Sequence, residues 1–446
     1  MALISVFEYQ RVRVGEPSSD DFAPCITRAQ ADILTSQKAK LGFEVFKFVN
    51  SNTVAAQQYV GVCQIGELTV EVLPKIDVEV GHVRKNLVAM IAETVDLAIK
   101  DGGVAYVGTQ NHCILEILIK LFSEKLFEQV RRGLVRRYET REENLSVLRG
   151  RLDIVQQMRV NIGNPERLFC RYQEFLEDIP LNQVFKAALR RLLKVTRRIP
   201  SQRLLAELLL MLNTVSDVPL AKLAWHEVHF DRMNERYRPS YKLAELFLKN
   251  MPPDVTGGRY DGFSLFFDMN VLFEEYIGRS VKQVMRDSGV MVSLQGKGGN
   301  QRYIARDSKG SGAFSMKPDI VGVKDGGYEW ILDTKWKMLS QIEWREGVAQ
   351  ADLYQMYAYA SCYDCPKVLL LYPHHHELGG RPGVRQTFSL NPWAANGMTR
   401  KEVMVASVDL RELEAVPMQL RTLLNESQEF DCSIEDGCSL KADIGV

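Results

Sequence analysis

The sequence lacks long hydrophobic runs, an excess of charge of one sign, and cysteine at any density. No segment approaches the roughly 20 consecutive apolar residues that a membrane-spanning helix needs. The first residues, MALISVFEYQRVRV, have no basic region ahead of their apolar part, so we expect no signal peptide. Lysine plus arginine and aspartate plus glutamate number 56 each, and this balance does not indicate a strongly basic nucleic-acid binder.

The low number of cysteines and the absence of one phosphate-binding motif are also informative. Eight cysteines scattered over 446 residues fit a reducing cytoplasm better than a disulfide scaffold, so we expect a cytoplasmic protein. The sequence contains no G-x-x-x-x-G-K-[ST] loop, so we expect this chain to bind and hydrolyse no nucleotide itself. The length allows two or three domains, and 46% hydrophobic and 25% charged residues are ordinary for a globular protein.

Three regions of the chain differ in residue pattern. Residues 1–90 are rich in alternating β-branched and aromatic residues, which predicts a small sheet or barrel-like unit with long loops. Residues 91–255 show helical periodicity, interrupted by a hairpin or strand at ENLSVLRGRLDIV. The prolines and glycines of KNMPPDVTGGRYDG favour a boundary, after which residues 256–427 alternate helix and strand. Residues 428–446 form a polar tail without an assigned role. The predicted fold class is α+β with several domains.

Charged residues interrupt two adjacent predicted strands in the segment MKPDIVGVKDGGYEWILDTKWKML. Side chains alternate along residues 328–336, so Ile331, Asp333 and Lys335 share one face, and we expect the opposite face to be the core side. A three-residue loop with a bulge at its last glycine, Gly327, would place Asp319 opposite Asp333. A two- or four-residue loop would turn Asp319 to the wrong face. The loop therefore decides whether two carboxylates meet.

Two carboxylates on adjacent strands repel each other unless positive charge lies between them. A hard divalent cation, Mg²⁺ or Mn²⁺, bound by Asp319, Asp333 and the Thr334 carbonyl oxygen would supply that charge. With Lys335 beside it, such an ion suits phosphodiester hydrolysis, because the ion activates water and the lysine orients or deprotonates that water or neutralises developing charge. The alternative is a solvent-exposed hairpin with an incidental Asp–Lys pair.

Flanking helices favour the catalytic interpretation over the exposed hairpin. On the predicted helix 271–285, Glu274 falls at the edge of the apolar stripe and is the better candidate for a metal-binding, catalytic carboxylate, whereas Glu275 falls on the polar face. Downstream, Gln355 and Tyr359 stand four residues apart on one helix face, where they can support the site.

The resulting order is a helix with glutamate, a Pro-Asp strand, an Asp-x-Lys strand, a Gln-x-x-x-Tyr helix and a buried strand. It resembles the PD-(D/E)xK nuclease fold, in the branch with a Gln-x-x-x-Tyr helix. The chain further resembles the McrC family, the nuclease subunit of McrBC-type modification-dependent restriction systems. The stretches that carry this resemblance are VGVCQIGELTVEVLPKI, LSVLRGRLDI, EDIPLNQVFKAALRRLL, FDMNVLFEEYI, MKPDIVGV, ILDTKWK and LYQMYAYA.

The resemblance implies a C-terminal PD-(D/E)xK α/β nuclease domain with a mixed sheet, in which Asp319, Asp333 and Lys335 match the catalytic motif and Glu274 the upstream glutamate. It also implies a McrB-like AAA+ GTPase hexamer as partner, which recognises DNA carrying modified bases. A finger-like region in residues 1–90 would contact that partner and stimulate GTP hydrolysis. The expected function is Mg-dependent cleavage of modified DNA. Two alternatives are a non-enzymatic activator of the GTPase and a stand-alone nuclease.

Further motifs allow both a functional and a structural interpretation. The basic cluster RRGLVRR, with Arg131, Arg132, Arg136 and Arg137, could contact DNA phosphates, pair with an acidic partner or form a solvated face, as could a second cluster over 190–198. The pair Cys362 and Cys365, with Cys432 and Cys438 downstream, has the spacing of an iron–sulfur ligand set but lacks an upstream ligand, so free thiols are expected. The triplet His374–His376 is expected to be a loop rather than a zinc site.

Overall fold

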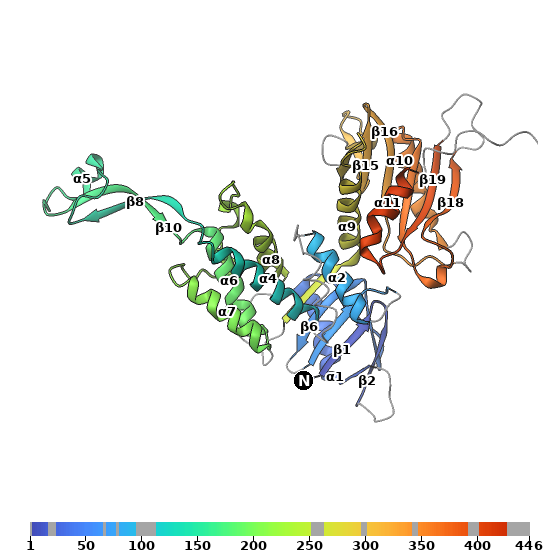
Figure 1. The fold of residues 1–446 in the computed structure, drawn as a ribbon, viewed down its shortest axis with the longest axis horizontal. Helices are drawn as coiled ribbons and strands as arrows, with labels where there is room; N and C mark the ends of the chain where they lie inside the picture. Colours follow the sequence, from blue (N-terminus) through green and yellow to red (C-terminus); the bar gives the residue numbers. More distant parts are fainter. Residues whose placement is uncertain are drawn as a thin grey trace, which may run out of the picture. The chain divides into compact units, whose positions relative to one another are not determined.

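The computed structural model describes residues 2–16, 24–65, 68–76, 80–94, 113–250, 263–295, 301–340, 347–390 and 401–425. These residues form a mixed α/β protein with two compact units (Figure 1). One unit comprises residues 1–75 and 79–269, and the other comprises residues 76–78 and 270–446. Within the described ranges, no helix is both long and apolar enough to span a bilayer.

The first unit begins with two four-stranded sheets that share one hydrophobic core. Their strand orders are β1-β7-β6-β11 and β3-β2-β5-β4. The strands are β1 (Ala2–Phe7), β2 (Arg11–Val14), β3 (Cys25–Ile26), β4 (Phe46–Asn50), β5 (Thr53–Ala56), β6 (Tyr59–Ile65), β7 (Leu68–Leu73) and β11 (Phe263–Asp268). The β-rich composition of this region is thus realised as two packed sheets, and contact of this region with a partner stays a prediction.

A helix, α1 (Arg28–Leu41), stands where the sequence predicted a long loop. Thr27 and Gln30 form a reciprocal capping box at its start, and Gly42 ends it in the left-handed conformation at φ 79°. On this helix Arg28 pairs with Asp32 four residues on, at 3.3 Å. The weak apolar periodicity of this stretch concealed the helix, although its cap motif was readable.

Strand β11 moves the domain boundary beyond its predicted place. It pairs antiparallel with β6, so residues 263–268 belong to the first unit, and the second unit begins after Met269 rather than at residue 256. Gly61 makes this pairing feasible, because a Cβ atom there would lie 2.0 Å from the Leu265 carbonyl oxygen. The predicted linker around residues 251–262 lies outside the described residues.

Helices follow the sheets within the same unit: α2 (Val80–Thr94), α4 (Ile114–Val130), α6 (Pro180–Val195), α7 (Ile199–Met211) and α8 (Arg238–Asn250). Glu71 on β7 joins them to the sheet, since its carboxylate accepts hydrogen bonds from Arg84 Nε of α2 at 2.7 Å and from the N–H of Ile114 at 2.8 Å. The helical region that we expected as a middle domain over 91–255 thus clusters with the N-terminal sheets.

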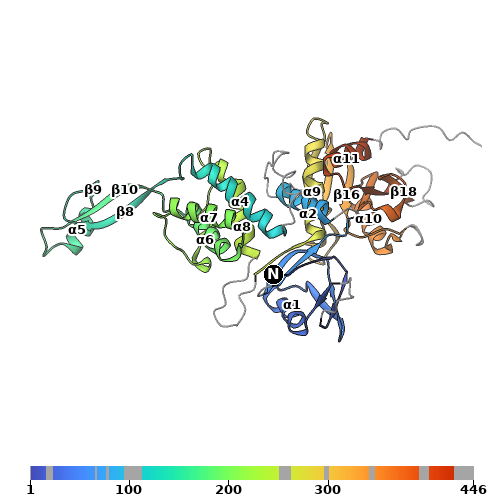
Figure 2. The ribbon, with the colours of Figure 1, turned by 60° about the horizontal axis from the view of Figure 1, so that its bottom comes forward.

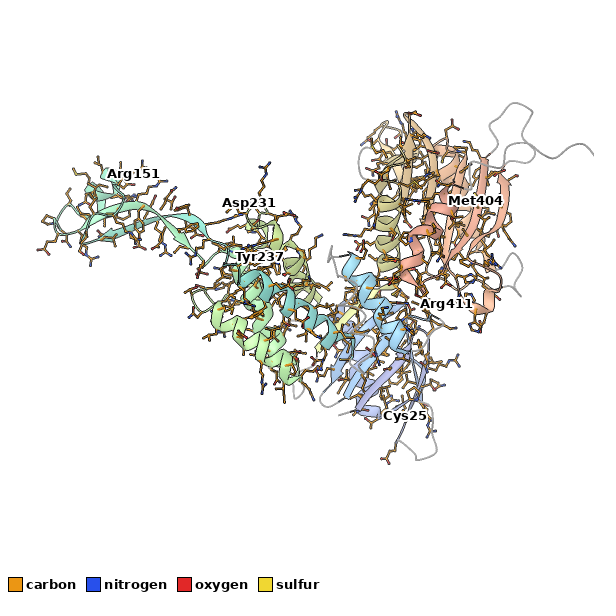
Figure 3. The ribbon with its side chains drawn as sticks, viewed as in Figure 1. Cys25, Arg151, Asp231, Tyr237, Met404 and Arg411 are labelled. Carbon is orange, nitrogen blue, oxygen red and sulfur yellow. The ribbon has the colours of Figure 1, made fainter. Side chains whose placement is uncertain are left out.

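A long antiparallel hairpin extends from these helices (Figures 1 and 2). It consists of β8 (Arg137–Leu145), β9 (Arg151–Leu152), the short helix α5 (Ile154–Val160) and β10 (Leu168–Leu176). In Figure 3, Arg151 lies near its far end, and Asp231 and Tyr237 lie in the helical part. The sequence predicted only a short interruption here, because the charged strand RYETREENL has no apolar face to announce it.

The second unit is built on a six-stranded mixed sheet of order β12-β15-β16-β17-β19-β18, in which β16, β17 and β19 run parallel. The buried runs KVLLLYP and VMVASV form its centre, as parallel strands covered on both faces require. Its strands are β12 (Met291–Leu294), β15 (Ile320–Lys324), β16 (Gly327–Thr334), β17 (Lys367–Pro373), β18 (Gly383–Leu390) and β19 (Lys401–Val408). Its helices are α9 (Met269–Val284), α10 (Gln350–Cys362) and α11 (Val416–Asn425), and β13 (Arg302–Arg306) pairs with β14 (Gly312–Met316) as a separate hairpin. The predicted polar tail lies outside the described residues.

Candidate active site

The turn between β15 and β16 differs from the predicted three-residue loop. Lys324 pairs with Gly327, so the loop has two residues, Asp325 at φ 49° and Gly326 at φ 82°, as a type I′ turn requires. A β-bulge then shifts the register between Gly322 and Val323. The bulge adds back the residue that the shorter loop removes, so Ile320 pairs with Leu332 as a three-residue loop would have placed it.

This compensation brings the predicted carboxylates together. Asp319 immediately precedes β15 and comes opposite Asp333 of β16 by continuation of the register. The Thr334 N–H and the Thr334 hydroxyl both donate to Asp319 Oδ2, at 2.7 and 2.8 Å. The Thr334 side chain therefore fixes the Asp319 carboxylate, a role that sequence reasoning did not assign. Metal binding by the Thr334 carbonyl oxygen stays a prediction.

The face that carries Asp333 is buried, contrary to expectation. Ile331 is fully buried and Asp333 is only 1% exposed, because α10 packs over this face with Met356 and Tyr359. Trp330 and Leu332 on the opposite face are buried as well. Both faces of β16 are thus core, and Asp333 is a charge-bearing side chain in an apolar setting rather than part of a solvated hairpin.

Lys335 is the cation of the site. Its Nζ atom lies 2.5 Å from Asp333 Oδ2 and 3.2 Å from Gln355 Oε1. The Lys335 side chain is 20% exposed, so solvent reaches it while Asp333 is closed off. Although Lys335 Nζ is close, Asp333 Oδ2 has no aligned hydrogen-bond donor.

The electrostatics of these groups follow from burial. Burial, together with the charge of Asp319, raises the pKa of Asp333 to about 7 despite the opposing effect of Lys335. Burial also raises the pKa of Asp319, although the Thr334 hydrogen bonds and Lys335 oppose the shift. Burial alone would lower the pKa of Lys335, but the Asp333 and Asp319 carboxylates outweigh it and raise that pKa. The single ammonium of Lys335 therefore does not fully offset the burial of the two carboxyl groups.

Glu274 on α9 reaches the same site, and Glu275 does not. Glu274 is half-buried while Glu275 is exposed, as the helical wheel predicted. Burial, and next the nearby charge of Asp319, raise the pKa of Glu274 to about 6. The Gln295 side chain donates a hydrogen bond to Glu274, and the Gln295 N–H donates to the Asp319 carbonyl oxygen at 2.7 Å. Gln295 was not predicted, and its φ of 53° marks it only in the structure.

Gln355 and Tyr359 lie on one face of α10, as the spacing predicted, and form a chain of hydrogen bonds. Gln355 accepts from Lys335 and donates through Nε2 to the Tyr359 hydroxyl at 2.8 Å, and that hydroxyl donates to the Lys317 carbonyl oxygen at 3.2 Å. These hydrogen bonds hold the Lys335 ammonium and the backbone two residues before Asp319. Asp352, three residues before Gln355, was missed: it pairs with Lys337 at 2.9 Å, and the Asp-x-Lys-x-Lys alternation was the readable signal.

The donor set suits a hard divalent cation. In the described ranges, no group of three or more histidine, cysteine, aspartate or glutamate side chains is arranged to hold an ion. Asp319 and Asp333 nevertheless offer carboxylate oxygens, and Asp333 Oδ2 is buried without an aligned donor. Mg²⁺ often takes only one or two protein carboxylates and keeps several waters. The residues present thus fit such an ion with water completing its coordination.

The predicted DNA-binding arginines lie at the base of the long hairpin, in the first unit. Arg136 donates twice to Glu177, at 2.9 and 2.6 Å, and Arg137 donates to the His229 carbonyl oxygen at 2.7 Å. Arg131 stacks over Phe127, and Arg132 is exposed. Arg136 thus pairs with a carboxylate of the same chain, and Arg137 lies 3.5 Å from Asp231 Oδ2. DNA contact by this cluster stays a prediction.

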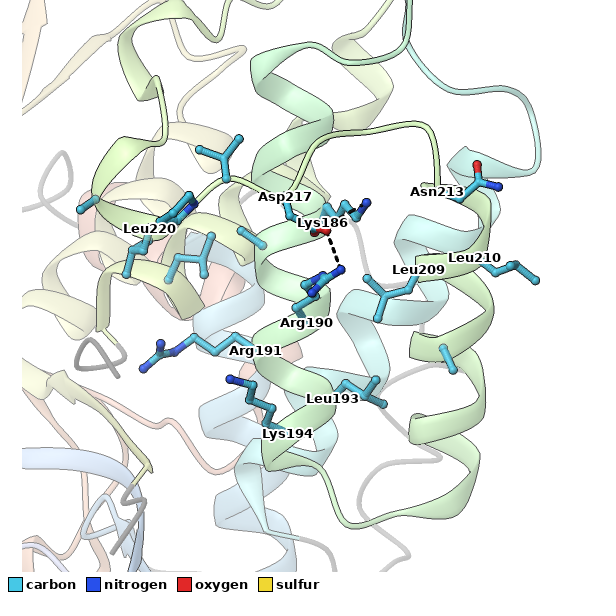
Figure 4. A pocket seen from close by; sticks show the side chains of 16 residues that line it. Lys186, Arg190, Arg191, Leu193, Lys194, Leu209, Leu210, Asn213, Asp217 and Leu220 are labelled. Carbon is cyan, nitrogen blue, oxygen red and sulfur yellow. Dashed lines mark hydrogen bonds and ion pairs between the residues drawn. The ribbon is translucent and has the colours of Figure 1, made fainter. Parts of the chain in front are cut away.

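Part of the second basic cluster, Arg190, Arg191 and Lys194, lines a groove of about 1080 Å³ between α6, α7 and the segment after α7 (Figure 4). Lys186, Arg190, Arg191 and Lys194 contribute its cations, and Asp217 pairs with Arg190 at 2.6 Å. None of the site carboxylates lines this groove, so the groove and the candidate chemistry are separate features.

The remaining motifs are structural within the described residues. Burial raises the pKa of the Cys365 thiol to about 11, which disfavours the thiolate that a metal would need, and Cys362 and Cys365 are free thiols. Cys432 and Cys438 lie outside the described residues. His374 contacts Ser407 Oγ at 3.1 Å and His375 contacts the Leu339 carbonyl oxygen at 2.7 Å, so these two rings serve packing rather than zinc binding.

Comparisons with known proteins agree on one family. Over residues 54–373 the sequence matches the family described as McrBC 5-methylcytosine restriction system component. A chain in the refined half-complex from a tetradecameric assembly of Thermococcus gammatolerans McrB AAA+ hexamers with bound McrC is 22% identical, with a TM-score of 0.67, covering 96% of this chain and 100% of that chain. A chain of the Thermococcus gammatolerans McrBC complex is 25% identical, with a TM-score of 0.50, covering 64% of this chain and 88% of that chain.

No curated protein matches the chain. The family match is nonetheless broad, since residues 54–373 make up most of the sequence and include every residue of the site built above. The chain belongs to the McrBC 5-methylcytosine restriction system component family, as a McrC-like subunit.

Proposed function

We propose that the chain is the metal-dependent DNA endonuclease subunit of a McrBC-like restriction complex, with a C-terminal domain of the PD-(D/E)xK type. One observation carries the proposal: Asp319 and Asp333 come from adjacent strands, and Lys335 Nζ lies 2.5 Å from Asp333 Oδ2. A solvated hairpin would leave these groups exposed, whereas Asp333 is 1% exposed. Burying a carboxylate costs free energy that an exposed position would not, which supports a functional reason for it.

Asp319 and Asp333 would hold Mg²⁺ or Mn²⁺, with Glu274 as a further carboxylate acting directly or through water. When bound, the ion stabilises charge on the phosphate and lowers the pKa of a bound water. Thr334 keeps the Asp319 carboxylate in place through two hydrogen bonds. Apolar packing buries Asp333, while the Lys335 side chain next to it is 20% exposed, so an ion and its waters would reach the carboxylates from the Lys335 side.

Lys335 acts as a positive charge and not as a base. The carboxylates raise its pKa, so the ammonium form prevails at neutral pH. A fixed ammonium can donate to the attacked phosphate or to the water and stabilise the negative charge that develops in the transition state. Gln355 orients it, and Tyr359 orients Gln355. This chain of contacts explains why a glutamine and a tyrosine four residues apart accompany an Asp-x-Lys strand.

The partner surface lies on the long hairpin. Its far end exposes Val147, Ile154, Val155, Met158 and Ile162, each more than 60% exposed. Exposed apolar clusters of this kind mark protein interfaces. Because Thermococcus gammatolerans McrC is bound to McrB AAA+ hexamers in a similar structure, we assign the finger-like, partner-binding role to residues 137–176, in place of residues 1–90.

The decisive experiment reconstitutes the chain with the AAA+ GTPase encoded beside it and measures cleavage of methylated and unmethylated DNA with GTP and Mg²⁺. Asp333→Asn and Lys335→Ala should each reduce the cleavage rate at least about 100-fold, since each removes a group that contacts the reacting phosphate or its ion. Lys337→Ala, an exposed lysine two residues further on, is the matched control and should cut normally.

The same experiment tests a second candidate function, a non-enzymatic activator of the GTPase. That alternative predicts normal GTPase stimulation and unchanged DNA cleavage in both site variants. Cleavage by the purified chain alone, without the GTPase, would instead identify a stand-alone nuclease.

A further inference from the structure

A small hairpin beside the site, β13 and β14, stands apart from the main sheet of the second unit. Its two strands pair antiparallel with each other and form a sheet of their own. All five residues of β13 are exposed, and β14 is exposed or half-buried until Met316. A two-stranded hairpin with both faces in water is marginally stable by itself, so its order must come from its base or from a partner.

The base of this hairpin is firmly anchored on α10. Arg302 donates to the Cys362 carbonyl oxygen at 3.0 Å, and its guanidinium stacks over the rings of Tyr328 and Tyr363, 5.2 and 5.6 Å from their centroids. At the opposite strand, Met316 is 4% exposed and belongs to the core beneath the sheet. The anchor fixes the direction in which the rest of the hairpin projects.

The hairpin is continuous with the carboxylate site. Met316 is followed by Lys317, whose carbonyl oxygen accepts from Tyr359, and then by Pro318 and Asp319. Five strand residues rise about 3.3 Å each, so the hairpin reaches roughly 17 Å from its base. That length corresponds to roughly five base pairs of B-DNA. A duplex whose phosphate lay at Asp319 would therefore meet the hairpin.

The hairpin presents positive charge. Arg306, Lys309 and Lys317 are exposed, and none of them pairs with an acidic side chain among the described residues. Asp307, in the loop between the two strands, accepts from the N–H groups of Lys309 and Ser311 at 2.9 and 2.8 Å. The acidic group is thus used inside the turn, and the cations face outward.

The same hairpin exposes apolar side chains between these cations. Tyr303, Ile304 and Phe314 are 45%, 58% and 75% exposed. Phe314 also holds a left-handed backbone at φ 58°, which a bulky side chain rarely adopts. Strained backbone at an exposed aromatic residue is found where that residue has a binding task. Proteins that insert into a groove of DNA commonly use apolar side chains flanked by arginine or lysine.

We propose that the β13–β14 hairpin enters a groove of the duplex next to the scissile phosphate, with Arg306 and Lys309 on backbone phosphates and Phe314 against sugars or base edges. This inference rests on the proposed nuclease function, because it takes DNA at Asp319 as its starting point. It assigns DNA contact to the unit that contains the carboxylates. Cations together with apolar side chains favour DNA over a protein partner, since lysine is depleted at the cores of protein interfaces.

The test measures binding of a short fluorescent duplex to the full chain by anisotropy over a range of salt concentrations, with Ca²⁺ in place of Mg²⁺ to limit cleavage. The double variant Arg306→Ala, Lys309→Ala should weaken binding about 10-fold or more and reduce the salt slope by roughly 1–2, as expected for two lost phosphate contacts. Phe314→Ala should weaken binding at least about fivefold with an unchanged salt slope. Lys324→Ala, an exposed lysine at the far end of β15, should change neither.

The outcomes separate this inference from the proposed function. Unchanged affinity and slope in the hairpin variants, with cleavage lost in Asp333→Asn, would overturn the hairpin inference and leave the nuclease intact. Hairpin-dependent binding by a chain that cuts no DNA would support the hairpin and overturn the nuclease. Normal DNA affinity with lost GTPase binding would show a protein interface, against the proposal. Equal melting temperatures of variants and wild type confirm that each variant is folded.

Discussion

At the scale of single residues, the site depends on a carboxylate that is almost fully buried. Asp333 is buried among apolar side chains, and its one close cation, Lys335, also faces solvent. The balance leaves Asp333 with a pKa of about 7, so the folded chain without an ion holds a proton there that the unfolded chain would release. The carboxylate that we assign to metal binding is therefore a source of instability when no ion is present.

Asp333→Asn should therefore change how stability depends on pH. Between an unfolded pKa of about 4 and the folded value of about 7, the wild-type free energy of unfolding should fall as pH rises, by on the order of 1–4 kcal/mol in total. The variant has no proton to lose at this position and should be more stable than wild type at pH 8, with a smaller difference at pH 5. Urea unfolding followed by circular dichroism, without divalent cations, measures both.

Asp325→Asn is the control for that experiment, because this exposed turn residue lies in the same unit. It should follow the wild-type pH dependence. A wild-type chain and an Asp333→Asn chain with parallel stability curves would contradict the assignment of a raised pKa to Asp333.

The sequence predicted these residues better than it predicted their surroundings. Alternation and spacing selected Asp319, Asp333, Lys335, Gln355 and Tyr359, and the structure brings all of them together. The burial of Asp333 was not predicted, because a charged residue in a strand reads as solvent-facing and the covering helix α10 is distant in sequence. Gln295 was not predicted either, because its contacts with Glu274 and Asp319 come with a left-handed backbone that the residue type does not indicate.

At the scale of elements, the register of β15 and β16 is set by two features that compensate each other. A two-residue turn by itself would move Asp319 to the face opposite Asp333, and the bulge after Gly322 restores the pairing. The sequence predicted the right register from the wrong turn, because DGG is compatible with a three-residue loop as well as with Asp-Gly in a type I′ turn. Bulges have no reliable sequence signal, so only the structure could distinguish the two.

Substitutions at the two glycines of this turn distinguish the same possibilities in solution. Gly326→Ala should destabilise the chain by about 1 kcal/mol, because φ is 82° there, although a Cβ atom would meet nothing within 4 Å. Gly327→Ala should be nearly neutral, since its backbone is not left-handed and a Cβ atom would lie 3.7 Å from the nearest atom. Urea unfolding of the two variants measures the difference. The reverse order of stability would indicate the three-residue loop.

At the scale of the whole molecule, segments that are distant in sequence pair in one sheet. Residues 263–268 follow the helices in sequence but complete the sheet formed by residues 2–73, which joins sequence-distant segments in one unit. Sequence analysis places the domain boundary at the proline- and glycine-rich stretch, because local composition does not indicate which distant strands pair. The long hairpin over 137–176 was underestimated for another reason: its strand β8 has no buried residue, so it lacks the apolar alternation on which prediction depends.

That hairpin gives the last prediction, which rests on the assignment of its end to the AAA+ partner. Ile154 and Val155 lie on α5 and are 69% and 76% exposed, so replacing both by aspartate should leave the fold of the free chain unchanged. If these side chains enter an apolar surface of the GTPase, burying two carboxylates there should weaken binding at least about 30-fold, as at an interface hot spot, and should remove GTPase stimulation. Glu166→Ala at the same end is the control. Full stimulation by the double variant would return the partner surface to the N-terminal sheets.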